Sequence, residues 1–176
     1  METNSLEHCI IRRIEPGDAE YLTNFYNGLG HEVIKRFRPL GWTATTEACE
    51  NVVAGNTAVP EYRFDLLALR EGRIVGWCFM WDVHTENPFF GLGIAAEERG
   101  KGLGARLMVL VMQEARRRKL QRIYLTVVTD NQIAWRLYEK QGFVKYDEYI
   151  DEADGLPYFR MQKIQPARLE DTEKPF

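Results

Sequence analysis

Three glycines at alternate positions, Gly100, Gly102 and Gly104, stand directly before a segment whose apolar residues follow helical spacing. Because glycine has no Cβ, the backbone of such a turn can approach another molecule closely and direct its N–H groups toward it. The first turn of the following helix adds unpaired N–H groups and the positive end of the helix dipole. This combination predicts a phosphate-binding site, and Arg99 and Lys101 add positive charge beside it.

Two common nucleotide-binding signatures also place glycines before a helix, and neither fits this chain. In the Walker pattern Gly-Lys is followed by Ser or Thr, whereas Lys101 is followed by Gly102. The dinucleotide fingerprint aligns only with residues 91–96, and these run into Glu97 and Glu98 and not into a helix. The glycine turn therefore predicts a different kind of phosphate ligand.

The glycine turn and a second motif further along the chain together resemble the GCN5-related N-acetyltransferase (GNAT) family. The coenzyme A loop of that family reads Arg or Gln, two residues, Gly, one residue, Gly or Ala, and Arg99, Gly102 and Gly104 match it. Residues 131–143 are similar to a later helix of the family, in which Asn, Ala, Tyr and a closing Gly-Phe recur. The two motifs stand in the family's order and separation, and the resemblance covers roughly residues 89–146.

The resemblance implies a site for acetyl-CoA as co-substrate and no metal. In the family the pantetheine arm lies between two splayed strands as a missing strand would, so we expect Leu92 and Ile94 to bind it through their main chains. The glycine turn is expected to hold the pyrophosphate. Asn131 is a good helix N-cap, and a contact with the cofactor is compatible with that role. The expected cofactor-binding residues are Leu92, Ile94, Arg99, Gly100, Lys101, Gly102, Leu103, Gly104, Ala105, Asn131 and Ala134.

Tyr138 is the residue to which the resemblance gives a chemical role. In the family the matching tyrosine directs its hydroxyl at the coenzyme sulfur and protonates the departing thiolate. A tyrosine that merely packs one turn after Trp135 is the alternative.

The general base for the acceptor amine is not identified by the resemblance, because the expected fourth strand contains no acid. The candidates are Asp82, His84 and Glu86 in the preceding loop, or a water chain to solvent.

Composition and charge describe an ordinary globular chain. Its 176 residues are 45% hydrophobic and carry a net charge of −3 with acids and bases intermixed, so neither nucleic-acid nor membrane binding is indicated. No leader or membrane span is recognisable, which favours a cytoplasmic protein. Cys9, Cys49 and Cys78 fit neither a disulfide framework nor a zinc site, and we expect buried thiols. A single domain is expected over residues 1–164, followed by a C-terminal tail over 165–176.

The elements that must position this site follow from apolar patterning together with the resemblance. They predict a mixed α/β (α+β) GNAT fold with a central sheet of about seven strands and about four helices. The fourth and fifth strands are expected to be parallel and splayed. The resemblance implies a bulge in the fourth strand, where Gly91 and Gly93 are typical either of a bulge or of a close backbone approach. Residues 31–45 are expected either to lie over the acceptor site or to be a plain connecting loop. The expected strands are 9–14, 64–69, 74–81, 89–95, 123–128, 144–150 and 156–164, and the helices begin near residues 18, 46, 103 and 131.

The function implied is transfer of acetyl from acetyl-CoA to a primary amine of a small molecule, by direct attack in a ternary complex, since no cysteine lies in the matched motifs. The alternatives are a peptide or protein N-acetyltransferase and a non-catalytic acyl-CoA-binding module. A closed aromatic pocket around Trp42, Phe89 and Tyr149 would favour the small acceptor, and an open cleft would favour the peptide.

Five acids within residues 147–154 either attract a cationic amine or keep a hairpin tip soluble. Monomer and homodimer are both compatible with the sequence.

Overall fold

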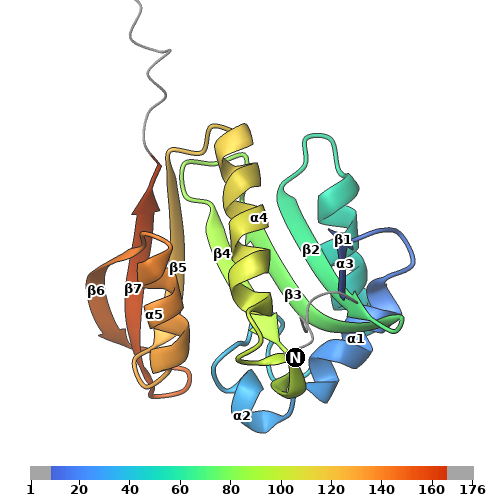
Figure 1. Cartoon of the computed structure of the whole chain (residues 1–176), viewed down its shortest axis with the longest axis horizontal. Coiled ribbons are helices and arrows are strands. Elements are labelled where there is room, and N and C mark those ends of the chain that lie inside the picture. Colours follow the sequence, from blue (N-terminus) through green and yellow to red (C-terminus); the bar gives the residue numbers. More distant parts are fainter. Residues whose placement is uncertain (1–8, 166–176) are drawn as a thin grey trace, which may run out of the picture.

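Seven strands form one mixed sheet in the computed structural model of the chain, which describes residues 9–165 (Figure 1). The order across the sheet is β1-β2-β3-β4-β5-β7-β6. This confirms the predicted mixed sheet of seven strands. Residues 1–8 of the expected domain and residues 166–176 of the expected tail lie outside the described residues. The strands are β1 (Cys9–Arg13), β2 (Arg63–Arg70), β3 (Arg73–Trp81), β4 (Phe89–Ile94), β5 (Arg122–Val128), β6 (Val144–Ile150) and β7 (Pro157–Ile164).

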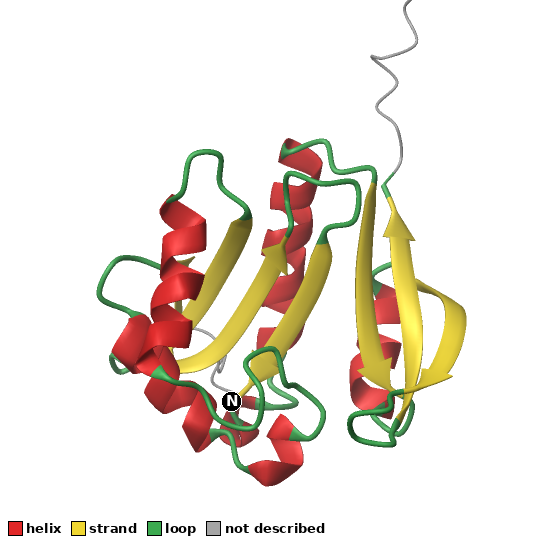
Figure 2. Cartoon of the chain, turned by 180° about the vertical axis from the view of Figure 1, so that it is seen from behind, coloured by secondary structure: helices red, strands yellow, loops and turns green. Residues whose placement is uncertain are grey.

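Helices cover both faces of the sheet. Figures 1 and 2 show α4 and α5 on one face, and α1 and α3 on the opposite face of the β1–β4 part. The four predicted helices are present, and a four-residue helix, α2, lies in the segment that had been expected to be irregular. None of the helices within residues 9–165 is long and apolar enough to cross a membrane. The helices are α1 (Ala19–Gly28), α2 (His31–Ile34), α3 (Thr46–Thr57), α4 (Leu103–Arg117) and α5 (Gln132–Lys140), with a 3₁₀ turn η1 (Ala96–Glu98).

Strands β4 and β5 run parallel and separate along their length, as predicted. A single residue pair, Phe89 with Tyr124, joins them in the ladder, and the Tyr124 N–H donates to the Pro88 carbonyl at 2.9 Å. β4 is paired with β3 from Phe89 to Ile94. The gap between β4 and β5 widens toward the carboxyl ends of both strands (Figure 2). The sheet therefore consists of an N-terminal half-sheet (β1–β4) and a C-terminal half-sheet (β5, β7 and β6) that meet at one pair.

The prediction of a bulge in β4 at Gly91 and Gly93 is wrong, because the β3–β4 ladder runs without a register shift. Both glycines instead make room for aromatic rings that pack across the strand. A Cβ on Gly91 would lie 2.2 Å from Cζ of Phe79, and one on Gly93 would lie 2.3 Å from Cε1 of Phe37. Of the two meanings of a glycine inside a strand, close approach of another group is the one that applies here.

A fully buried carboxylate, that of Asp65, lies in the core of the N-terminal half-sheet. Arg63 donates two hydrogen bonds to it at 3.0 and 2.9 Å, the Asn56 amide donates one at 2.7 Å, and the Trp77 indole donates one at 2.8 Å. A buried charge is tolerated when a partner of opposite charge and further donors surround it. This group joins α3 to the two central strands β2 and β3.

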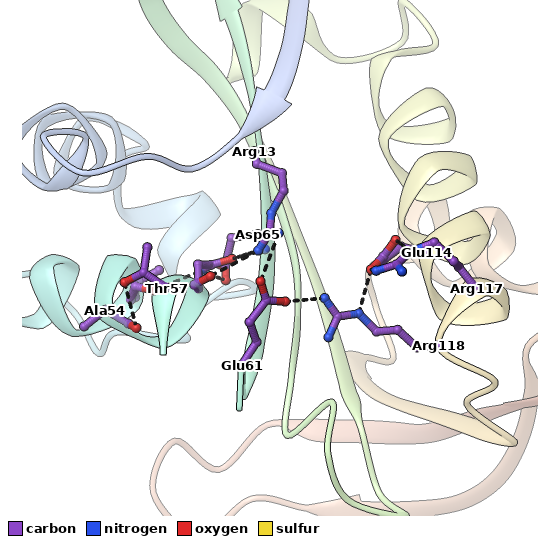
Figure 3. Close-up of polar contacts among 10 residues, drawn as sticks. Arg13, Ala54, Thr57, Glu61, Asp65, Glu114, Arg117 and Arg118 are labelled. Carbon is purple, nitrogen blue, oxygen red and sulfur yellow. Dashed lines mark hydrogen bonds and ion pairs between the residues drawn. The ribbon is translucent and has the colours of Figure 1, made fainter. Parts of the chain in front are cut away.

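A chain of ion pairs joins elements from both faces of the sheet (Figure 3). Glu61, between α3 and β2, accepts from Arg13 of β1 at 3.2 Å and from Arg118 at the end of α4 at 2.5 Å. Arg118 also donates to Glu114 of α4 at 2.6 Å. These contacts fix the end of α4 that lies away from the glycine turn, so the helix is anchored to the layer behind the sheet.

The remaining local expectations have mixed outcomes. Cys9, Cys49 and Cys78 are free and buried, as predicted. Gln165, which had been assigned to the tail, is buried, and its N–H donates to the Gln121 carbonyl at 2.9 Å. The boundary between domain and tail stays a prediction, because residues 166–176 lie outside the described residues.

We predict that Gly91→Ala destabilises the fold by about 1–3 kcal/mol, because the added methyl must displace the Phe79 ring in a packed core. Urea unfolding of the variant checks this. A double-mutant cycle with Phe79→Leu should show that the smaller side chain recovers part of the loss. Gly28→Ala is the matched control, since a Cβ there meets nothing within 4 Å. Equal midpoints for Gly91→Ala and the unchanged chain would contradict the packing described here.

Candidate functional site

The glycine turn adopts a backbone that requires glycine at two of its three positions. Gly100 and Gly102 have φ values of +74° and +83°, and Gly102 is the N-cap of α4 in the left-handed region. Gly104 lies inside the first turn of α4, where an added Cβ would make an ordinary contact of 3.4 Å with Leu92. No side chain caps this end of α4, so its first N–H groups, from Leu103 to Ala105, are not bonded by a capping side chain.

The charged and apolar residues of the turn have distinct surroundings. Lys101 lies 3.5 Å from the buried carboxylate of Glu98, which Arg70 also contacts at 2.9 Å. Lys101 is therefore directed in part toward the protein, and its expected role at a phosphate stays a prediction. Arg99 is exposed and, within residues 9–165, has no ion-pair partner. The Leu103 side chain is fully buried, so only its main chain is available to a ligand.

The edge of β4 that faces β5 presents main-chain groups beyond the single ladder pair. The Ala95 N–H donates to the Val75 carbonyl of β3, whereas the Pro88 carbonyl accepts from β5. Main-chain groups alternate sides along a strand, so those of Leu92 and Ile94 point toward the gap. This is the arrangement by which an extended ligand can add to a strand edge. A cofactor contact at Leu92 and Ile94 stays a prediction.

Tyr138 of α5 is buried against β4 beside this gap. Its ring lies 5.9 Å from that of Phe90 in an edge-to-face arrangement and 6.2 Å from that of Phe143. Burial, and to a lesser degree the nearby Cys78 thiol, raises the pKa of the Tyr138 phenol well above its ordinary value. Among the described residues the hydroxyl has no hydrogen-bond partner, in contrast to the buried Tyr26 hydroxyl, which donates to Gly41 at 2.6 Å. The Tyr138 hydroxyl is therefore a neutral hydrogen-bond donor that has no acceptor among the described residues.

Asn131 caps α5, as expected from its position. Its side-chain oxygen accepts from the Ala134 N–H at 3.3 Å. The Ala134 N–H therefore already has a hydrogen-bond acceptor within the protein. The side-chain amide nitrogen of Asn131 is the donor at this position that a ligand could reach. A cofactor contact at Asn131 and Ala134 stays a prediction.

Residues 31–45, which we call the strap, connect the two half-sheets at the open end of the gap. Arg36 donates two hydrogen bonds to Asp130, at 3.2 and 3.0 Å, and these lower the pKa of Asp130. Arg38 pairs with Asp154, whose carboxylate also accepts from the Tyr158 hydroxyl at 2.8 Å. The strap is thus more than a connecting loop, since its two arginines bind acids of the C-terminal half-sheet.

An open cleft of about 580 Å³ lies on the C-terminal half-sheet. Figures 1 and 2 show α5 on one face of this half-sheet, and the cleft lies on the other face. Along β5, Ile123 and Val127 are buried in the core, and the alternate residues Tyr124 and Thr126 line the cleft. Phe89 and Tyr124, which form the single β4–β5 pair, both line the cleft. The cleft therefore begins where the gap between the two strands closes. It is lined by Asn87, Phe89, Arg122, Tyr124, Leu125, Thr126, Tyr146, Arg160 and Gln162.

The cleft differs from the aromatic pocket that the sequence suggested. Of the three expected aromatic residues only Phe89 lines it. Trp42 lies on the strap, half-exposed and stacked on the His31 ring at 5.0 Å, and Tyr149 stacks on Tyr158 at 5.5 Å. Tyr124 and Tyr146 take their place, with ring centroids 6.2 Å apart. Tyr146 falls in the register shift between Lys145 and Asp147, a detail of strand pairing that sequence patterning does not reveal.

The three candidate bases lie apart from this lining. Asp82, His84 and Glu86 are all exposed in the loop between β3 and β4, and Asn87 is the only residue of that loop that lines the cleft. The described residues contain no group of three or more His, Cys, Asp or Glu side chains placed to hold a metal ion. The site thus combines a strand edge, an uncapped helix end, a buried tyrosine and a cleft without an acid.

Comparison with known proteins places these features in a family. A family model described as acetyltransferase (GNAT) family matches residues 31–143. N-alpha-acetyltransferase 30 of Schizosaccharomyces pombe is 31% identical over 108 residues, which cover 56% of this chain and 71% of that protein. Mycothiol acetyltransferase of Saccharomonospora viridis is 32% identical over 103 residues, or 52% of this chain. The matched part spans only 33% of that mycothiol acetyltransferase and 27% of the one from Thermomonospora curvata.

Solved structures share the fold over most of the chain. A GNAT-family acetyltransferase from Streptococcus pneumoniae has a TM-score of 0.75 at 25% identity and covers 89% of this chain and 98% of its own. Spermidine N-acetyltransferase from Vibrio cholerae, solved with CoA and spermine, has a TM-score of 0.71 at 20% identity and covers 90% of this chain and 96% of its own. At this identity the second likeness concerns the fold.

We predict that alanine at the second and third glycines of the turn changes stability in opposite directions. Gly102→Ala should cost about 1–2 kcal/mol, because the residue must keep a positive φ. Gly104→Ala should be neutral or stabilise by up to about 1 kcal/mol, because alanine favours a helix and the added Cβ makes only ordinary contacts. Urea unfolding of both variants checks the pair. A loss at Gly104 equal to that at Gly102 would show that the turn is built differently.

Proposed function

The chain belongs to the acetyltransferase (GNAT) family, and we propose that it transfers the acetyl group of acetyl-CoA to a primary amine of a small molecule by direct attack in a ternary complex. The observation that carries this proposal is the single-pair junction of β4 and β5, which opens a free strand edge beside the uncapped N-terminus of α4. Relatives and neighbours named as N-acetyltransferases support it.

The proposed cofactor site uses main-chain groups more than side chains. When bound, acetyl-CoA supplies the acetyl group as an activated thioester. We assign its pantetheine arm to the edge at Leu92 and Ile94, and its pyrophosphate to Gly100–Gly104 with the first N–H groups of α4. Arg99 adds a positive charge at the same end. An extended arm that bonds to the strand edge fills the gap in the sheet in the way that an added strand would.

Tyr138 is proposed as the general acid. As the acceptor nitrogen forms its bond to the carbonyl carbon, the carbon–sulfur bond breaks and the sulfur needs a proton. The phenol is neutral at physiological pH because burial raises its pKa, so it holds a proton to donate. Its ring packs on Phe90, the residue of β4 that follows the pair at which the gap closes, and this position supports the role.

The acceptor amine must lose a proton before it can attack, since a lysine-like amine has a pKa of about 10.4. Asp82, His84 and Glu86 are exposed and do not line the cleft, so their positions do not support a role as base. We propose that the proton leaves through water in the cleft, which is open to solvent. The absence of a carboxylate in the lining favours this route over a side-chain base.

Access to the proposed site differs between the open end of the gap and the cleft. The strap crosses the open end of the gap and is held there by its ion pairs with Asp130 and Asp154, which limits access from that side. The limited access at the strap supports a small acceptor, whereas the cleft of about 580 Å³ is open to solvent, as a peptide acceptor would require. A peptide acceptor is the second candidate, because one relative is named as an N-alpha-acetyltransferase.

We predict that Tyr138→Phe lowers the rate of acetyl transfer by about 10²- to 10⁴-fold, the usual contribution of a general acid. Coenzyme A affinity should change by less than about threefold, because the ring and its packing on Phe90 are kept. Release of free thiol from acetyl-CoA measures the rate across amines, amino sugars, amino acids, polyamines and short peptides. Tyr21→Phe, an exposed tyrosine on α1, is the control and should keep the full rate.

The same assay separates the candidate functions. Turnover of a small amine with loss in Tyr138→Phe supports the proposal, whereas preference for peptides supports the second candidate. Tight coenzyme A binding without turnover of any acceptor class would instead favour a non-catalytic acyl-CoA-binding module. An unchanged rate in Tyr138→Phe would remove the tyrosine from the mechanism while leaving the enzyme assignment in place.

A further inference from the structure

One arginine on the cleft face of β5 has no acidic partner. Arg122 lines the cleft, and its Nη1 donates to the Tyr124 hydroxyl at 3.2 Å. Within residues 9–165 no carboxylate lies at ion-pair distance from it. The other arginine of the lining, Arg160, pairs with Asp147 and lies over the Tyr149 ring at 4.1 Å. Arg122 is therefore the cation of the cleft that remains available to a ligand.

The groups around Arg122 suit an anion. Gln162 lies directly opposite Tyr124 in the β5–β7 register, so its amide is on the same face as the two tyrosines. Tyr146 meets Tyr124 edge to face. The lining contains two arginines and no acid. A guanidinium presents several N–H donors in a planar fork that matches a carboxylate, and neighbouring hydroxyl and amide groups can add further hydrogen bonds.

The acids of the β6–β7 hairpin do not offset this charge. Asp147 and Asp154 are each paired with an arginine, and Asp151 accepts from the Ala153 N–H at 2.8 Å. Of the five acids that were considered as attractants for a cationic amine, Glu148 and Glu152 are exposed and do not line the cleft. The electrostatic preference of the lining is thus set by Arg122.

We infer that the acceptor is an amine that also carries a carboxylate, and that Arg122 binds this carboxylate. The inference rests on the proposed function, because the amine must reach the gap beside Leu92. The Arg122 guanidinium lies at the level of Tyr124, whose ladder partner is Phe89. Leu92 is three strand residues further along β4, about 10 Å along the strand, so the acceptor must carry its amine and its carboxylate several carbon atoms apart. An α-amino acid is too short to span this distance.

The test compares matched acceptors that differ in one charge. The probes are 6-aminohexanoate and 8-aminooctanoate, each against its neutral primary amide, with β-alanine and its amide as a short pair. With the full chain and acetyl-CoA, thiol release should give about a tenfold higher kcat/KM for the long acids than for their amides, and no preference for β-alanine. Arg122→Gln should reduce the acid-to-amide ratio to about one, and Arg122→Lys should retain part of it. Arg73→Gln, an exposed arginine on the far side of the sheet centre, is the control and should keep the ratio.

A binding measurement keeps this inference separate from the proposed function. Calorimetry with coenzyme A present compares 8-acetamidooctanoate with 8-acetamidooctanamide on the unchanged chain and on Arg122→Gln. Preferential binding of the acid that is lost in the variant supports the carboxylate site, even where acetyl transfer is not detected and the proposed function fails. Equal turnover or equal binding of acid and amide, or a preference that survives Arg122→Gln, overturns the inference while acetyl transfer itself stands.

Discussion

The site depends on the fact that β4 and β5 share one backbone pair. Two parallel strands that stay together would satisfy each other's main-chain groups, and the edge at Leu92 and Ile94 would be closed. The half-sheets must then be held by other contacts. Tyr138 packs on Phe90 from the helical face, and the strap pairs with Asp130 and Asp154 at the open end. The groups that keep the gap in shape are therefore also those nearest the proposed chemistry.

Local features of this molecule were predictable from the sequence, and contacts between distant segments were not. The glycine turn and the cap of α5 are set by neighbouring residues, so their residue types carry the information. The strap joins Arg36 to a residue 94 positions away, and no local pattern marks Asp130 as its partner. Gly91 and Gly93 indicated that another group packs closely against the strand. That these groups are the rings of Phe79 and Phe37 depends on how α1, the strap and β3 pack together. That Trp42 and Tyr149 do not line the same cleft as Phe89 could not be predicted for the same reason.

The two halves of the proposed reaction use different kinds of group. In the proposal the cofactor is held by main-chain N–H and C=O groups and by glycines, which tolerate many neighbouring side chains. The acceptor is held by side chains such as Tyr124 and Arg122, which stand on one sheet face. A fold shared with solved structures at identities of 20% and 25% by itself leaves the acceptor unspecified.

The row of aromatic rings in the N-terminal half-sheet has an optical consequence. Trp77, Phe79, Trp81 and Phe89 follow one another with centroid separations of 4.8, 5.0 and 5.2 Å, and the last of them lines the cleft. Trp81 is thus one ring away from any molecule that occupies the cleft, whereas Trp77 is fully buried and bonded to Asp65. The intrinsic emission of the protein combines four indoles, of which Trp81 stands one ring from the cleft and Trp77 lies in the core. A change in emission on ligand addition that is lost in Trp81→Phe therefore reports on the cleft, and one lost in Trp77→Phe reports on the core.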